Sequence, residues 1–469
     1  MTSANAHNDI LSPRLLRLHS DMLDDASAVP RFWDEMAERG TPLIEPIPDM
    51  DHQMLLTFLW RAGDDVEHVA LICDLTGYDP PQTLMQRMPD TDIWHKSLVV
   101  PDDLRCSYRL SPNDSLVPVE QVTDWFARSA TFQTDPLNSR RMDWLMDLDT
   151  PNELGWCYSI CELPNAPPQP WVQPRPDVAK GTVRKYTLRS AILEAEMHVW
   201  VYTPPDFSSD GEPYHTLVLF DAEAYNGQLV DVPTTLDNLL AERHIPPMVT
   251  LFVDNPDRQR LLCCHTPFVE YLTTELLPWA RGTLHLSADP ADVIVGGSSL
   301  GGLAAAYAAL VHPEVFGNVL AQAGAFCWWG RDGEIVHGWL PQQFAATPPL
   351  PIRFYLDIGL LETDAPPFGG VTGLECTRGM RDTLRANGYT VHYQEFIGGH
   401  DYACWQGTIA DGILALIGRS QLLNDGKEAK GCKDRTSSRQ EPTDDTMLTG
   451  WFFYEGQASK RWPSRRCSL

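Results

Sequence analysis

The sequence is short of basic charge. It carries 36 Lys and Arg residues against 63 Asp and Glu residues, for a formal net charge of −27 over 469 residues. This surplus of acid excludes a basic nucleic-acid groove, and it argues against an anionic membrane as the main partner. Hydrophobic residues make up 43% and charged residues 21% of the chain, which is ordinary globular usage and excludes a largely disordered protein. The length predicts two or three domains.

Cysteine is sparse, and its spacing matches no known framework. The chain has 11 cysteines, and no two of them form a C-x-x-C pair. Cys157 and Cys161 lack a second Cys or His pair at zinc-finger spacing. We therefore expect buried, reduced thiols and a reducing, cytoplasmic compartment.

Long apolar runs and cofactor fingerprints are also missing. The N-terminus has acidic residues where a signal peptide needs a basic start, so we do not expect export by that route. Residues 293–311 are apolar or small, but glycines and serines interrupt them, which predicts a buried strand, a tight turn and a buried helix rather than a membrane span. No P-loop or dinucleotide motif occurs and no metal-ligand cluster stands out, so we expect neither a cofactor nor a metal site.

The first half of the chain predicts a β-rich domain. Residues 31–39 place apolar side chains at helical spacing, and Gly40 follows where a helix C-cap is expected. Short apolar stretches then alternate with polar turns from about Met54 to Arg109, which indicates an immunoglobulin-like β-sandwich. Six prolines in residues 162–176 predict a stiff, extended linker.

The second half alternates strands with helices. Apolar strands such as HTLVLFD, PMVTLFVD and DVIVGG are separated by helical patterns, which is typical of a mostly parallel sheet covered by helices on both faces. After about residue 420 no periodicity continues, and we expect a flexible tail. The predicted divisions are an N-terminal extension (1–27), the sandwich (28–170), the linker (171–180), an α/β-hydrolase domain (181–420) and the tail (421–469).

A candidate nucleophile lies between a strand and a helix. The motif G-x-S-x-G spans residues 297–301, after the strand DVIVG and before the helical run LAAAYAALV. This context is that of a nucleophile elbow, in which small neighbours allow a sharp turn that presents Ser299 above the sheet. The helix N-terminus behind it favours developing negative charge. Ser298, its neighbour, is expected to pack inward.

The remaining triad members should follow in the order acid, then histidine. His400 lies in IGGHDYACW, after a strand and two glycines, where a loop brings an imidazole over the elbow; His312 and His392 fit structural positions better. The acid should follow the strand IRFYLDIG. Asp357 lies within that strand, so Glu362 in the loop is our first choice, with Asp364 as the alternative.

Two backbone amides and several aromatic residues complete the expected site. The amides of Leu300 and of Ala222, which follows the strand HTLVLFD, should form the oxyanion hole. Trp328, Trp329 and Trp405 should lie nearby; paired tryptophans are more often core than ligand platform, although flat aromatic ligands would suit them.

The chain closely resembles the enterochelin (enterobactin) esterases of the α/β-hydrolases. The resemblance lies in VGGSSLGGLAAAYAALVHPEVFGNVLAQAGAFCWW and GGHDYACW of the second half, and in FWDEMAERGTPLIEP, TFLWR, TDIWHKSL, DPLN and LPNAPPQPW of the first. It spans roughly residues 28–418. Two halves that match in order are far more specific than the elbow alone.

This resemblance implies a cytoplasmic serine esterase that opens the trilactone of a ferric catecholate siderophore, so that iron can be released. It implies Ser299 as nucleophile, His400 as base, Glu362 as acid, and Arg258 as an arginine near the active site. Iron would enter only as part of the substrate. Because ferric catecholates are anionic and the chain is acidic, arginines such as Arg109, Arg140, Arg141 and Arg258 would have to offset the net charge locally. The alternatives are a broader carboxylesterase of feruloyl type and a non-catalytic ligand-binding protein.

Overall fold

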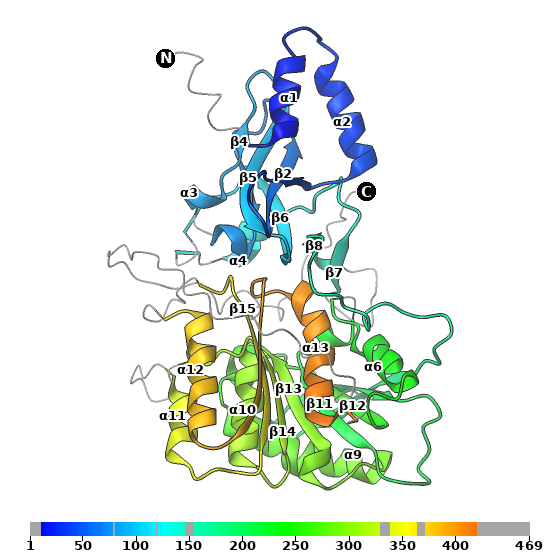
Figure 1. Ribbon diagram of the computed structural model, residues 1–469. Coiled ribbons are helices and arrows are strands. Elements are labelled where there is room, and N and C mark those ends of the chain that lie inside the picture. The colour runs from blue at the N-terminus through cyan, green and yellow to red at the C-terminus, as the bar shows by residue number, and fades with distance from the viewer. Residues whose placement is uncertain are drawn as a thin grey trace.

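The computed structural model divides into an upper β-rich part and a lower α/β part (Figure 1). Trp329, Asp364 and the predicted tail lie outside the described residues. The structure describes residues 11–77, 80–118, 121–122, 124–145, 154–227, 229–328, 338–363 and 371–419.

A helix pair opens the chain. Helix α2 (Ala28–Arg39) contains the predicted helix and ends at Gly40, whose φ of 83° explains the glycine. Helix α1 (Pro13–Asp21) begins after Ser12, whose side chain accepts from the Leu15 amide. Leu15 and Leu18 are buried in one cluster with Phe32 and Met36. The stretch predicted as an N-terminal extension therefore contains a helix that packs on the β-rich part.

Two four-stranded antiparallel sheets form the β-rich part, as the expected sandwich requires. Phe58 from one sheet and Tyr108 from the other meet edge to face at 4.8 Å inside their common core. The immunoglobulin-like class itself stays a prediction. The sheets have the orders β1 (Leu43–Pro46), β2 (Gln53–Arg61), β5 (Ile93–Pro101), β4 (Gln86–Arg87), and β3 (Val69–Ile72), β6 (Arg105–Pro112), β8 (Leu154–Glu162), β7 (Arg141–Leu145), with η1 (Asp74–Thr76), α3 (Pro80–Thr83) and α4 (Trp125–Ser129) between strands.

The proline-rich segment is docked along the α/β part. The Asn238 side chain donates to the carbonyls of Trp171 and Gln173 at 2.8 and 2.9 Å. The Gln169 side chain donates to the Ala403 carbonyl at 2.9 Å. This segment therefore fixes the path between the two parts of the chain.

An eight-stranded sheet organises the α/β part. Strands β11 to β16 run parallel, and β9 and β10 are antiparallel at one edge, so the sheet is mixed rather than purely parallel. The stretch 293–311 forms a buried strand and a buried helix, as predicted. The order is β16 (Thr390–Phe396), β15 (Arg353–Gly359), β14 (Asn318–Gln322), β13 (Val293–Ser298), β11 (His215–Phe220), β12 (Met248–Val253), β10 (Glu196–Thr203), β9 (Thr182–Arg189).

Helices cover both faces of this sheet (Figure 1). On one face, α6 (Val232–Ala241) and α13 (Tyr402–Ile417) share a core cluster with the strands. The opposite cluster contains residues of α9, α10, α11 and α12. The bounds are α9 (Leu277–Leu284), α10 (Leu300–Val311), α11 (Trp339–Ala346) and α12 (Gly373–Ala386), with short turns α5 (Ala222–Tyr225), α7 (Arg258–Leu262), α8 (Thr266–Glu270), η3 (Tyr271–Leu276) and η4 (Pro290–Asp292).

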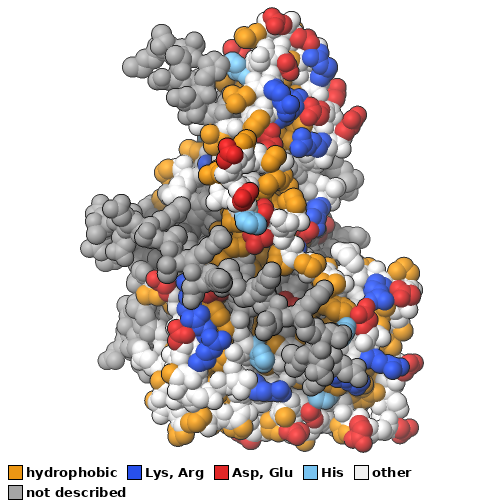
Figure 2. Space-filling view, in the orientation of Figure 1, with side chains coloured by type: hydrophobic (Ala, Val, Ile, Leu, Met, Phe, Trp, Pro, Cys, Tyr) orange, Lys and Arg blue, Asp and Glu red, His pale blue; other side chains and the backbone are white. Residues whose placement is uncertain are grey.

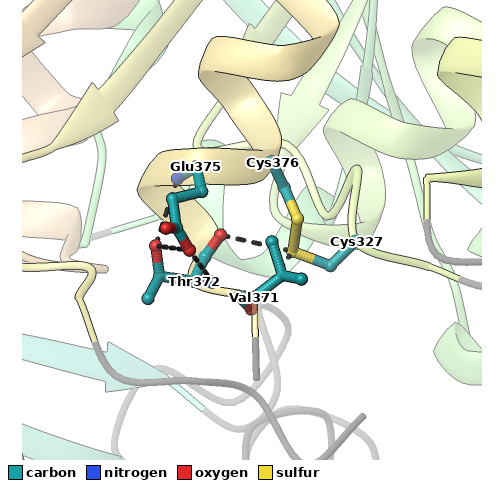
Figure 3. The surroundings of a disulfide bond; sticks show 5 residues. All are labelled: Cys327, Val371, Thr372, Glu375 and Cys376. Carbon is teal, nitrogen blue, oxygen red and sulfur yellow. Dashed lines mark hydrogen bonds between the residues drawn. A yellow bond between two sulfur atoms is a disulfide. The ribbon is translucent and has the colours of Figure 1, made fainter. Parts of the chain in front are cut away.

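One disulfide corrects the prediction that the cysteines are reduced. Cys327, after β14, is bonded to Cys376 in the first turns of α12, with the two Cα atoms 5.3 Å apart (Figure 3). This pairing could not be predicted from the sequence, because 49 positions separate the two residues and only the fold brings them together. The other cysteines in the described ranges are thiols, and all but Cys263 are buried.

The surface carries charges of both signs. On the face in Figure 2, acidic and basic side chains are interspersed over both parts of the molecule. No helix within the described ranges has both the length and the apolar character that a membrane span requires.

Candidate active site

Ser299 stands at the sharp turn between β13 and α10. Its φ of 55° and ψ of −118° form a conformation that residues with a side chain rarely adopt. Its amide donates to the Gln322 carbonyl at 2.9 Å, and its carbonyl accepts from the amides of Leu303 and Ala325 at 3.1 and 2.9 Å. These bonds hold the strained turn in place, which is the geometry of a nucleophile elbow.

Small neighbours make this turn sterically feasible. A Cβ atom on Gly297 would lie 3.0 Å from the Gly301 Cα atom, so a larger residue would force the turn open. Ser298 is fully buried, whereas Ser299 retains 9% of its surface. The structure therefore presents Ser299 and packs Ser298 into the core, as the strand-to-helix pattern predicted.

His400 and Glu362 form a hydrogen-bonded pair. His400 lies between β16 and α13, and Glu362 follows β15. Nδ1 of His400 lies 2.8 Å from Oε2 of Glu362. Because an ionised carboxylate only accepts, this contact assigns the proton to Nδ1 and leaves Nε2 as the basic nitrogen. The His400 side chain is 19% exposed and that of Glu362 4%, so the acid is the more deeply buried partner.

The Glu362 carboxylate is fixed by its surroundings. Its Oε1 accepts from the Gly359 amide at 3.1 Å, at the end of β15. Its main-chain carbonyl accepts from the Leu374 amide at 3.1 Å, in the first turn of α12. A glutamate held in this way through both its side chain and its main chain can orient the imidazole of His400.

The other two acid candidates are Asp357 and Asp364. Asp357 is fully buried in β15, and its Oδ1 accepts from the Ala323 amide at 3.1 Å. Burial raises the pKa of Asp357 to about 7. Asp364 lies outside the described residues. The pairing with the imidazole therefore goes to Glu362, the first choice from the sequence.

Both amides predicted for the oxyanion hole belong to the first residues of helices. Leu300 begins α10, and Ala222 begins α5. The first N–H groups of a helix have no acceptor within that helix, so they suit a developing negative charge. The preceding strands β13 and β11 are parallel neighbours in the sheet. Both amides therefore lie at the same edge of the sheet as Ser299.

Arg258 lies beside the nucleophile elbow, where its guanidinium donates to the Ser298 carbonyl at 3.4 Å. It is only 8% exposed, and its guanidinium donates to both carboxylate oxygens of Asp221 at 2.9 and 3.0 Å. Asp221 has a φ of 56° and immediately precedes Ala222. The charge of Arg258 is therefore paired within the fold, and its expected contact with substrate stays a prediction. It braces the turn that carries Ala222.

The tryptophans are core residues where the structure describes them. Trp328 is 7% exposed and meets the Trp339 ring at right angles, with centroids 5.6 Å apart. Trp405 is completely buried, and its ring lies 4.8 Å from the His400 ring at 83°. Protein atoms cover almost all of both rings in this structure, and their expected role in substrate binding stays a prediction. Trp405 supports the imidazole.

The remaining arginine candidates also interact with neighbouring side chains. Arg109 is 4% exposed and lies between two aromatic rings, each 4.5 Å from its guanidinium carbon. Arg140 and Arg141 pair with neighbouring carboxylates. In the described part of the chain no three His, Cys, Asp or Glu side chains gather as metal ligands would.

Sequence reasoning missed the contribution of the β-rich part to this site. The Ser107 amide in β6 donates to the carboxylate of Asp401, which adjoins His400. The two glycines before His400 signal a close approach by some other group. The partner lies 294 positions earlier, which is why no local pattern could name it.

Comparison with known proteins identifies the family. Residues 190–416 match the family model described as putative esterase, and residues 55–172 match the model for the N-terminal region of enterochelin esterase. An iron(III) enterobactin esterase of Dickeya dadantii is 30% identical over 433 residues, which cover 82% of this chain and 92% of that protein. The chain belongs to the enterobactin esterase family. It is accordingly a hydrolase of ester bonds.

Other relatives extend the same conclusion. An iron(III) salmochelin esterase of Escherichia coli is 28% identical over 406 residues, 82% of this chain and 93% of that protein. The crystal structure of ferric enterobactin esterase from Salmonella typhimurium is similar with a TM-score of 0.67 and 26% identity, over 83% of this chain and 99% of that one. The Shigella flexneri enterobactin esterase, crystallised in the presence of enterobactin, gives a TM-score of 0.66 at 25% identity, over 82% and 96% of the two chains. The family resemblance noted from the sequence is confirmed.

Proposed function

We propose that this protein hydrolyses the lactone esters of a ferric catecholate siderophore of the enterobactin type. The relatives named above are esterases of iron(III) enterobactin and iron(III) salmochelin, and their sequences align over both halves of this chain. Iron enters as part of the substrate, and the protein itself uses no cofactor. The reaction takes place in the cytoplasm and leaves the iron in an opened ligand that holds it less tightly.

The proposed chemistry follows an acyl-enzyme route. His400 Nε2 takes the Ser299 hydroxyl proton as the oxygen attacks a lactone carbonyl carbon. The Leu300 and Ala222 amides stabilise the oxyanion. The carbon–oxygen bond of the ester breaks, and His400 returns its proton to the leaving alkoxide. A water molecule then attacks the carbonyl carbon of the acyl-Ser299 ester while His400 takes one of its protons. The bond from that carbon to the Ser299 oxygen breaks, His400 returns the proton to this oxygen, and the acid product is freed.

One observation carries this proposal. The strained turn at Ser299 and the contact of 2.8 Å between His400 and Glu362 lie at the carboxyl ends of β13, β16 and β15. The carboxyl ends of parallel strands meet at one edge of a sheet, where α/β enzymes place their chemistry. A decayed elbow that only binds ligand would have no need to keep a buried carboxylate against a histidine.

A chromatographic time course tests the proposal. Purified protein and its Ser299→Ala variant are incubated with ferric enterobactin, and the linear trimer, dimer and monomer are followed. We expect the wild-type protein to form all three, and the variant to be slower by about 10³-fold or more. Ser298→Ala is the matched control and should retain most of the activity, because that hydroxyl is buried beside the elbow.

Two results would contradict the proposal in different ways. If the wild-type protein leaves the siderophore intact but hydrolyses simple aryl esters, the esterase chemistry stands and the substrate is of another class. If Ser299→Ala is as active as the wild-type protein, the nucleophile has been assigned to the wrong residue.

A further inference from the structure

The segment that carries His400 is bonded to the N-terminal domain. Residues 397–401 connect β16 to α13. The Arg105 amide in β6 donates to the Ile397 carbonyl at 3.1 Å, and the Ser107 amide donates to the Asp401 carboxylate. Two amides of one strand of the sandwich therefore hold both ends of the five-residue segment.

The Asp401 carboxylate accepts hydrogen bonds from two elements. Its Oδ2 accepts from the Ser107 amide of β6, and its Oδ1 accepts from the Ala403 amide at 2.7 Å, which caps α13. It is 4% exposed, and burial raises the pKa of its carboxyl. A buried carboxylate stays in place only when its acceptor positions are filled, so these contacts fix the residue that directly follows His400.

Gly399 shows how closely the domains approach. A Cβ atom built on Gly399 would lie 1.9 Å from Oδ2 of Asp74, in the turn η1 of the N-terminal domain. No side chain fits at that distance, so glycine is required by a contact with the other domain. The sequence showed the glycine but not the group that makes it necessary.

The loop that carries Glu362 also packs against the N-terminal domain. Leu361, beside Glu362, and Ile397 both pack against the core cluster of the sandwich. The Leu361 amide donates to the Gly398 carbonyl at 2.9 Å, which links the two loops. The loops that carry His400 and Glu362 are therefore bonded to each other, and both pack against the N-terminal domain.

We infer that Asp401 is a positioning residue through which the N-terminal domain holds His400 in reach of Ser299. On this inference the domain does more than enclose a substrate, because it sets the geometry of the general base. The inference rests on the proposed serine-esterase mechanism. It does not depend on which ester is the substrate.

A functional consequence separates this role from that of a substrate cover. Misplacing a general base slows every reaction of the nucleophile, including reactions with reagents too small to touch the N-terminal domain. Losing a substrate cover raises the KM for a large ligand and leaves small reagents unaffected. The reactivity of Ser299 towards a small fluorophosphonate therefore reports on the base alone.

The first test is Asp401→Asn in the full-length protein. Asn keeps one acceptor for the α13 cap but presents an NH₂ group to the Ser107 amide. We expect the fluorophosphonate labelling rate and the kcat for p-nitrophenyl acetate to fall about 10- to 100-fold, with KM within about twofold. The matched control is Asp237→Asn, which alters another buried carboxylate that accepts from the Gly181 amide at 2.8 Å and the Tyr202 hydroxyl at 2.7 Å.

The control separates position from stability. Both variants lose a buried charge-assisted contact, so both should lower the unfolding temperature. Only Asp401→Asn should slow labelling. The inference is overturned if Asp401→Asn is labelled at the wild-type rate, or if the two variants slow labelling equally.

A second test uses rescue across the domain contact. Gly399→Ala brings a methyl group against Asp74 and should slow labelling about 10-fold or more, because the loop must shift. Adding Asp74→Gly removes the opposing side chain and should restore most of the rate, although the two positions lie in different domains. If the double variant stays as slow as Gly399→Ala, the loop is not set by this contact and the inference fails.

These outcomes are distinct from failure of the proposed function. If the wild-type protein is not labelled at Ser299, the serine mechanism itself is wrong. If it is labelled but does not cleave the siderophore, only the substrate is wrong, and the comparison among variants still decides the role of Asp401.

Discussion

At the scale of single residues, the pairing of His400 with Glu362 makes a direct prediction. In Glu362→Gln the side chain still reaches the imidazole, but an amide can donate to Nδ1 and favour the wrong tautomer. We expect kcat to fall roughly 10³- to 10⁴-fold, as when a triad carboxylate is made neutral, with little change in KM. Steady-state kinetics on an aryl ester would measure it.

The control for this variant lies on the next helix. Glu375→Gln changes a glutamate in the capping box of α12, where Gln serves equally well. It should leave kcat unchanged. A Glu362→Gln enzyme that keeps more than about a tenth of the wild-type kcat would show that the orientation of His400 does not depend on this carboxylate.

Asp357 makes stability depend on pH. Its pKa rises from 3.8 to about 7 because it is buried, so the folded protein keeps a proton there that the unfolded chain has lost. The stabilising effect of this proton is complete below about pH 4 and is lost as pH rises through about 7. Between about pH 4 and about pH 7, each rise of one pH unit should lower the free energy of unfolding by roughly 1.4 kcal/mol through Asp357 alone.

The Asp357→Asn variant isolates this effect, because Asn is neutral at every pH. Between about pH 5.5 and pH 8, the unfolding free energy of the wild-type protein should fall by about 2 kcal/mol relative to the variant. Denaturant titrations of both proteins at the two pH values would measure the difference. A difference that does not change with pH would mean that Asp357 is already ionised in the folded protein at the lower pH.

At the scale of elements, the disulfide ties the segment after β14 to α12. Sγ of Cys327 lies 3.5 Å from the Thr372 carbonyl oxygen, at the cap of α12 (Figure 3). The carbonyl of Glu362 meets the same first turn. The disulfide therefore closes a loop of 49 positions around the acid-bearing edge of the sheet.

Removing this cross-link should destabilise the fold. Closing a loop of this length typically stabilises a protein by about 2 to 4 kcal/mol, mainly by restricting the unfolded chain. The double variant Cys327→Ser/Cys376→Ser should lose about that much unfolding free energy in denaturant titrations. Cys263→Ser, at a half-buried cysteine outside any disulfide, is the control and should stay near wild type. An unchanged double variant would show that packing alone holds these segments together.

At the scale of the whole molecule, the two domains share packing rather than lying side by side. Met142 of β7 is buried in the same cluster as Leu236 of α6 and Ile413 of α13. The proline-rich segment contacts both of these helices. A sandwich anchored in this way cannot swing freely above the site, which suits a domain that holds the His400 segment in place.

The elbow was predictable because it is local. A strand, a turn of small residues and a helix within one continuous stretch suffice to place Ser299, and the order of the triad along the chain limits the choice of acid and base. Glu362 was preferred over Asp357 for a local reason as well, since a residue inside a buried strand cannot reach a loop. The strands of the α/β domain could also be predicted from their apolar runs.

The contacts of Arg258 and Trp405 could not be predicted in this way. The resemblance implied that Arg258 lies near the active site, and Trp405 follows His400 closely in the sequence, yet neither fact says which way a side chain faces. Asp221 takes the charge of Arg258 from 37 positions away. Trp405 lies in the first turn of α13, and its ring is buried in the core next to His400.

The sequence by itself determined the α/β class of the second half, the elbow motif and the family, because these depend on periodicity and on short motifs. Only the tertiary structure decided the disulfide between Cys327 and Cys376, the burial of Arg258, and the hydrogen bond from β6 to Asp401. Each of these is a contact between residues that are distant in the chain, so it forms only when the packed fold brings the partners together. Local patterns predict where elements begin and end, whereas packing determines which side chains meet.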